Sequence, residues 1–141
     1  MAEPLLIDWT EPPAMDVGAP EPMIRQEGSG LLVSYFTRDN AVAVLRFDDV
    51  SAYSLGPPND EILDTHPLYA LGLKPYSFFE VSQPGSQQRD VRAATSERHW
   101  IATFHDDTLE VHAGSAWVLT NDAGQQSPSE AIRTIILSHQ R

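Results

Sequence analysis

Two alternating runs of residues on either side of Asp106-Asp107 constrain the fold more than any other feature of this sequence. Residues 99–105 (HWIATFH) and 108–114 (TLEVHAG) largely alternate between apolar and polar side chains, which is typical of strands with one buried face. The two aspartates between the runs indicate the turn of an antiparallel hairpin. This turn places three apolar pairs on one face: Phe104 with Leu109, Ala102 with Val111, and Trp100 with Ala113.

The register of this hairpin determines which side chains the core receives. A slip by one residue would bury Glu110 and His112, so the alternation specifies the two faces strongly. Asp-Asp suits a type I′ turn poorly. A four-residue loop, which we expect to leave the same residues facing each other, is therefore the alternative to a two-residue turn.

A second hairpin is predicted near the start of the chain. Residues 31–37 (LLVSYFT) and 41–47 (AVAVLRF) are β-rich runs around the polar turn Arg38-Asp39-Asn40. Both runs are apolar on both faces, so we expect them to be central strands that are covered on two sides. Three further runs are predicted to be strands: residues 50–55, 76–82 and 115–120. The alternative for the last run is that it continues the strand before it.

Helices are predicted in the middle of the chain and at its end. Asn59 or Asp60 is placed to cap a short helix over residues 61–64, and Gly72 ends a second one over residues 66–71. Ser127, Pro128 and Glu130 have the spacing of a capping box that begins a C-terminal helix, although the β-branched residues 134–136 favour a strand. The sequence therefore predicts an α+β fold: a mainly antiparallel sheet of five to seven strands with short helices and a C-terminal helix.

The N-terminal segment differs from the rest of the chain. Residues 1–24 hold five of the eleven prolines and five acids but no Lys or Arg, and proline fits neither a regular helix nor a central strand. We expect an extended, proline-rich acidic arm over residues 1–24 and a single globular domain over 25–141. Four apolar side chains of the arm should pack on the domain or on a partner: Leu5, Leu6, Ile7 and Trp9.

The charge of the chain limits its partners. It has 20 Asp and Glu against 9 Lys and Arg, a formal net charge of -11. Such a surface repels nucleic acids and anionic membranes, so we predict binding to neither of them and suspect a basic protein partner. The start of the chain lacks the features of a secretory signal, and no run approaches the ~20 apolar residues of a membrane span. A cytoplasmic location is the expectation, and the oligomeric state stays open.

The polar face of the 98–114 hairpin holds the candidate site. Candidate catalytic residues on it are His99, Thr103, His105, Glu110 and His112. Imidazoles beside a carboxylate pair as acid and base, or bind Zn²⁺, and the candidate metal ligands are His105, Glu110 and His112. The alternative without a functional site is that these side chains form the solvent-exposed face of a half-buried hairpin. No metal motif such as H-E-x-x-H is present, and the chain has no cysteine, so we expect no cofactor, with zinc as the alternative.

The same hairpin carries a resemblance. The stretch RHWIATFHDDTLEVHA, with GPPND and HPLYALGL upstream, resembles a group of uncharacterised bacterial proteins that carry an H-[FYW]-[IV]-x-T-F-H-D-x-T-x-E stretch. The likeness covers less than a third of the chain and implies no activity. It does imply that five residues belong together: His99, Thr103, His105, Asp106 and Glu110.

Two functions follow from these observations. The first is an acidic cytosolic protein-interaction module, of the kind that immunity proteins form when they neutralise a basic toxin. It rests on charge, size and the partly apolar arm, and it favours a protein that is not an enzyme. The alternative is a small enzyme or metal-binding protein that uses the His/Glu face of the 98–114 hairpin.

Overall fold

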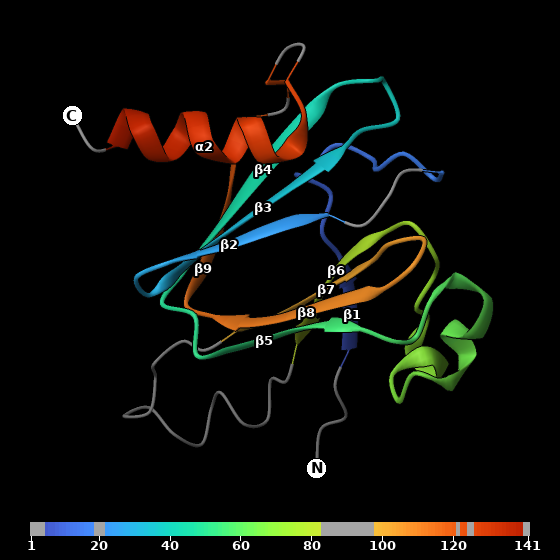
Figure 1. Cartoon of the computed structure of the whole chain (residues 1–141). Helices are drawn as coiled ribbons and strands as arrows, with labels where there is room; N and C mark the ends of the chain where they lie inside the picture. Colours follow the sequence, from blue (N-terminus) through green and yellow to red (C-terminus); the bar gives the residue numbers. More distant parts are fainter. Residues whose placement is uncertain (1–4, 19–21, 83–97, 121, 124–125, 140–141) are drawn as a thin grey trace, which may run out of the picture.

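A computed structural model describes residues 5–18, 22–82, 98–120, 122–123 and 126–139. Within these residues, nine strands form two antiparallel sheets (Figure 1). The first sheet has the order β1 (Leu5–Asp8), β6 (Phe78–Ser82), β7 (Arg98–Thr103), β8 (Thr108–Ala113), β5 (Ala52–Gly56). The second has the order β2 (Met23–Glu27), β3 (Gly30–Phe36), β4 (Val42–Asp48), β9 (Ser115–Thr120).

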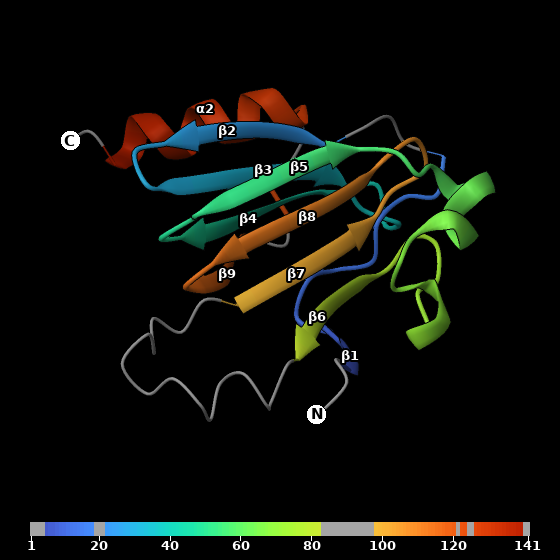
Figure 2. The same ribbon diagram turned by 90° about the horizontal axis from the view of Figure 1, so that it is seen from below.

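The two sheets pack face to face around one apolar core. Phe47 and Tyr35 from the second sheet meet Trp100 and Phe78 from the first, with ring centroids 5.5 Å apart for Phe47–Trp100 and 5.3 Å for Tyr35–Phe78. Each sheet is also covered over part of its outer face (Figure 2). The helix α2 (Pro128–His139) packs on the second sheet, and the 3₁₀ segments η1 (Asp60–Thr65) and η2 (Tyr69–Leu71) lie beside the first.

The antiparallel sheets and the C-terminal helix are as predicted, but five to seven strands was too low a number. Strand β1 lies in the proline-rich segment, and β2 has the largely polar sequence MIRQE of an exposed edge strand. Neither has the apolar alternation that identifies a strand from sequence. The division into two sheets occurs at Gly114, between β8 and β9, where a Cβ atom would lie 3.2 Å from the Cβ of Asp49.

Local signals for turns and caps are confirmed. Asn40 adopts a φ of 62° in the turn between β3 and β4. The Asn59 side chain accepts the N–H groups of residues 61 and 62 at 3.1 Å, and Gly72 ends η2 with a φ of 114°. Ser127 and Glu130 bond reciprocally as a capping box, and the segment after it is a helix rather than a strand.

The 98–114 hairpin has the predicted faces but a different register. Thr103 lies opposite Thr108, which leaves a four-residue loop. We expected this loop to keep the same residues facing each other, and that was wrong because every pair moves by two positions. Trp100, Phe104, Leu109 and Val111 remain on the buried face, since a shift of two preserves the alternation.

The described part of the N-terminal segment lies against the domain. β1 pairs with β6, and the Trp9 ring lies 6.0 Å from the rings of Phe47, Phe78 and Trp100. Leu5 and Ile7 are 57% and 50% exposed. Residues 1–4 and 19–21 are outside the described part of the chain. Among the described helices, none is long and apolar enough to cross a membrane.

Candidate functional site

The carboxylate of Glu110 lies between two imidazole rings on the outer face of the first sheet. Its Oε1 is 2.8 Å from Nε2 of His99 on β7, and its Oε2 is 2.8 Å from Nε2 of His66, which follows η1. His99 in turn stacks on His112, with ring centroids 4.1 Å apart and an interplanar angle of 18°. We call these four residues the Glu110 cluster. It joins two strands of the sheet to the segment that covers them.

His66 enters the cluster because of its place in the chain. It precedes Pro67, which favours an extended backbone, and its φ and ψ of -69° and 137° end η1. Its Nδ1 accepts the N–H of Leu68 at 3.0 Å, so Nε2 carries the proton that is donated to Glu110. The side chain is only 4% exposed, and both ring nitrogens are bonded.

The electrostatics of Glu110 follow from these bonds. The hydrogen bond from His99 is the largest influence, and the bond from His66 adds to it. Both favour the charged carboxylate more than burial opposes it, and together they lower the pKa of Glu110 to about 2. The carboxylate is therefore ionised throughout the physiological range.

Asp60 is the centre of a second cluster at the end of the same sheet. The Tyr76 hydroxyl donates to Asp60 Oδ2, and Nδ1 of His105 lies 3.0 Å from the same oxygen. The bond from Tyr76 is the main reason why the pKa of Asp60 is lowered, and the same bond raises the pKa of Tyr76. Tyr76 has a φ of 57°, unusual for an aromatic residue, while its N–H donates to the carbonyl of Thr103 at 2.7 Å.

The Thr103 side chain bonds to backbone groups and belongs to neither cluster. It is 1% exposed, its hydroxyl donates to the Lys74 carbonyl at 2.6 Å, and it accepts the Ser77 N–H at 2.9 Å. These bonds tie the chain before β6 to β7. They leave the hydroxyl no free direction in which to orient a reacting group.

The candidate residues thus fall into separate places. Glu110, His99 and His112 come together, whereas His105 is paired with Asp60 and Thr103 is buried between backbone segments. Among the described residues, no group of three or more His, Asp or Glu side chains is arranged to hold a metal ion. Sequence reasoning missed His66 and Tyr76. His66 is 44 positions from Glu110, and its only local signal is the proline that follows it.

The segment that covers the first sheet also gathers acidic side chains. The Asp60 N–H donates to the His105 carbonyl at 3.1 Å, which brings η1 beside the loop between β7 and β8 (Figure 1). The acidic end, as we name it, consists of five residues: Asp60, Glu61, Asp64, Asp106 and Asp107. Ile62 and Tyr69, which are 47% and 45% exposed, come from the same η1–η2 segment.

Comparisons of the chain with protein-family models, with curated protein sequences and with solved structures find no match.

Proposed function

We propose that this protein is an acidic interaction module that binds a basic protein through its acidic end. The observation that carries the proposal is the meeting of two acidic segments 42 or more positions apart, at residues 60–64 and 106–107. Clustered carboxylates steer a basic partner and orient it as it docks. Exposed Ile62 and Tyr69 add apolar contact area beside the charges, and such side chains supply much of the binding energy in interfaces.

The distribution of basic residues supports the same orientation. Leu32 of β3 lies opposite Arg25 of β2 on one side and opposite Arg46 of β4 on the other. Arg133 is exposed on α2. These three arginines lie on α2 and on the sheet face that it covers, and Figure 2 shows α2 apart from η1. Because these arginines are accompanied by Glu27, Asp48 and Glu130, that side carries mixed charge rather than a concentration of acids.

The two histidine–carboxylate clusters hold the acidic end in one arrangement. His66–Glu110 fixes the end of η1 to β8, and Asp60–His105 fixes its beginning to the β7–β8 loop. Leu63 and Leu73 fasten the segment to Phe79 and Ile101 of the sheet. A surface that is ordered before binding loses less conformational entropy when the partner docks.

More specifically, we propose neutralisation of a basic protein in the cytosol, as immunity proteins neutralise toxins. A single domain with an ordered acidic surface suits occlusion of a basic site, since binding alone is required. Basic proteins encoded beside this one are the first candidate partners.

The proposal is tested by neutralising acids in matched sets. Glu61→Gln, Asp64→Asn and Asp106→Asn remove three exposed charges from the acidic end, and Asp8→Asn, Asp39→Asn and Asp49→Asn remove three exposed charges elsewhere. Calorimetry would measure the affinity for a peptide of alternating arginine and leucine at low salt. We expect the first set to weaken binding by about tenfold or more, and the second to weaken it by less than about threefold.

The controls are the two variants' thermal midpoints and the same titration at about 1 M salt, where exposed charges are screened within ~3 Å. Equal losses of affinity for both sets would mean that net charge alone attracts the peptide. That result would contradict a binding site at the acidic end.

A second candidate function, a metal-binding or catalytic site, rests on the Glu110 cluster. A carboxylate with a pKa of about 2 between two imidazoles is the kind of perturbed group found at functional sites. Both of its oxygens already accept ring N–H groups, so a zinc ion would have to displace a histidine. Zinc titration followed by the imidazole NMR signals separates the two functions: saturable shifts of His66 and His99 would favour the metal site.

A further inference from the structure

A cavity lies between α2 and the outer face of the second sheet. At the Val42 end of β4, Ala131 and Ile132 of α2 pack directly against the sheet. Along β3, strand alternation puts Gly30 on the same face as Leu32, and glycine has no side chain to fill the space under the helix. A cavity of about 210 Å³ remains there.

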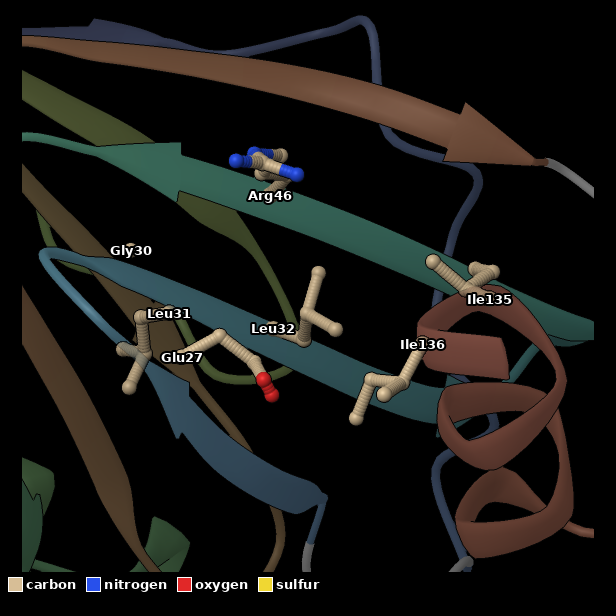
Figure 3. A pocket seen from close by; sticks show the side chains of 7 residues that line it. All are labelled: Glu27, Gly30, Leu31, Leu32, Arg46, Ile135 and Ile136. Carbon is tan, nitrogen blue, oxygen red and sulfur yellow. The ribbon is translucent and has the colours of Figure 1, made fainter. Parts of the chain in front are cut away.

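The cavity has an apolar floor and an apolar wall. Leu32 of β3 forms the floor, and Ile135 and Ile136 of α2 form the wall (Figure 3). Gly30 continues the floor, and a Cβ atom there would lie 3.3 Å from the carbonyl oxygen of Glu27. These surfaces favour a ligand with an apolar group of its own, because that group leaves water when it binds.

Two opposite charges approach this floor from its two sides. Glu27 is on β2 and Arg46 is on β4, the two neighbours of β3. Strands on either side of a third are about 10 Å apart, and Figure 3 shows the two side chains on either side of Leu32. Of the two arginines opposite Leu32 in the described sheet, Arg46 lines the cavity and Arg25 does not.

Both charged groups have capacity for a ligand. Arg46 is oriented through its Nε, which donates to Asp48 Oδ1 at 2.7 Å, and Asp48 Oδ2 in turn accepts the Trp117 ring N–H at 2.8 Å. Among the described residues, none accepts a hydrogen bond from the Arg46 Nη groups, and none donates to the Glu27 carboxylate. A guanidinium binds a carboxylate through its N–H groups, and a carboxylate accepts from an ammonium group.

We propose that this cavity binds an apolar α-amino acid in its zwitterionic form. The carboxylate of the ligand bonds to the Nη groups of Arg46, and its ammonium group bonds to Glu27. The apolar side chain of the ligand lies on Leu32, against Ile135 and Ile136. This site is distinct from the acidic end, and it does not depend on the function proposed for that end.

The size and charge of the cavity select this class of ligand. A volume of about 210 Å³ corresponds to roughly seven water molecules at ~30 Å³ each, and pockets for drug-sized molecules begin at ~300 Å³. A fatty acid would leave Glu27 without a partner beside a second negative charge. An amine without a carboxylate would leave Arg46 without one, so each of these ligands is disfavoured by the charge that it fails to pair.

An NMR titration of the full chain with L-leucine, up to about 50 mM, tests the proposal. Leucine has about nine non-hydrogen atoms, so we expect a dissociation constant between about 10 μM and about 1 mM. The saturable shifts should include the amide signals of Leu32, Ile135 and Ile136. Leucinamide lacks the carboxylate and 4-methylpentanoate lacks the ammonium group, and each should bind about tenfold or more weakly than leucine.

Two substitutions assign the charged ends of the ligand. Arg46→Gln should weaken the binding of leucine by about tenfold or more without weakening that of leucinamide. Glu27→Gln should weaken leucine to a similar extent without weakening 4-methylpentanoate. The matched controls are Arg38→Gln and Glu61→Gln, which remove the same charges at exposed positions outside the cavity and should change the constant by less than about twofold.

Circular dichroism of the variants verifies that α2 and the sheets are retained, and the three ligands test the unaltered chain without any substitution. Absence of saturable shifts with leucine would overturn the proposal, as would shifts confined to other parts of the chain. Equal affinities for leucine, leucinamide and 4-methylpentanoate would show that the two charges do not recognise the ligand, and would also overturn it. None of these results bears on the acidic end, which is tested with the basic peptide.

Discussion

Glu110 accepts a ring N–H from a histidine on the sheet and another from a histidine on the segment that covers it. Glu110→Gln keeps the shape of this side chain and removes its charge. Because hydrogen bonds to a charged group contribute about 1.5–3 kcal/mol, we expect a loss of that size in the free energy of unfolding, measured by urea denaturation. Exposed Glu61→Gln should change it by less than ~0.5 kcal/mol. Equal effects would show that Glu110 does not hold the cover in place.

The pKa of Glu110 gives the same residue a defined pH dependence. Its pKa is lowered from 4.5 to about 2 in the folded protein, so the folded state binds this proton less readily than the unfolded state. The stabilisation is present above about pH 4.5 and is lost as the pH falls toward 2. The difference in unfolding free energy between the native chain and Glu110→Gln should therefore shrink over this interval. A difference that stays constant from pH 5 to about pH 2 would contradict the assignment.

Phe104 tests the buried face of the 98–114 hairpin. It is 4% exposed and packs against Tyr35 and Phe78, with centroids 5.9 and 6.1 Å away. Phe104→Ala should cost ~3–5 kcal/mol in unfolding free energy, a large part of the ~5–15 kcal/mol of a typical domain. Ile62→Ala, at a position 47% exposed, is the control. A cost below about 1 kcal/mol for Phe104→Ala would mean that the side chain is not in the core.

At the scale of elements, the sequence predicts what depends on neighbours in the chain. The β3–β4 turn, the Ser127 capping box and the faces of the β7–β8 hairpin all follow from short-range patterns. The register of that hairpin does not, because Phe104 looks like a strand residue but belongs to the loop. The partner of His99 depends on this register. The partners of His105 and the second partner of Glu110 could not be predicted because they depend on where η1 docks.

The N-terminal strand gives a prediction about elements. Deleting residues 1–9 removes the β1–β6 pairing and the Trp9 ring from among Phe47, Phe78 and Trp100. We expect a fall in unfolding free energy comparable to the ~3–5 kcal/mol of a buried aromatic residue, seen as a lower melting temperature. Trp9→Ala alone should account for most of it. An unchanged melting temperature of the truncated chain would show that β1 and Trp9 contribute nothing to stability.

At the scale of the whole molecule, the acidic end and a region of mixed charge lie on different sides. The acidic end lies beside the first sheet, whereas α2 and the sheet face that it covers carry three arginines together with three acids: Arg25, Arg46, Arg133, Glu27, Asp48 and Glu130. Net charge was available from composition, but this separation requires the two-sheet arrangement and the docking of η1. It is also the reason why we assign a basic partner to the side of the first sheet.

Hydrogen–deuterium exchange with and without the arginine–leucine peptide is the most direct test of an ordered acidic end that binds basic proteins. The account predicts slower exchange at residues 60–65 and 104–107 when the peptide is bound, and loss of this protection at about 1 M salt. Saturating peptide that protects other segments and leaves these two unchanged would contradict it.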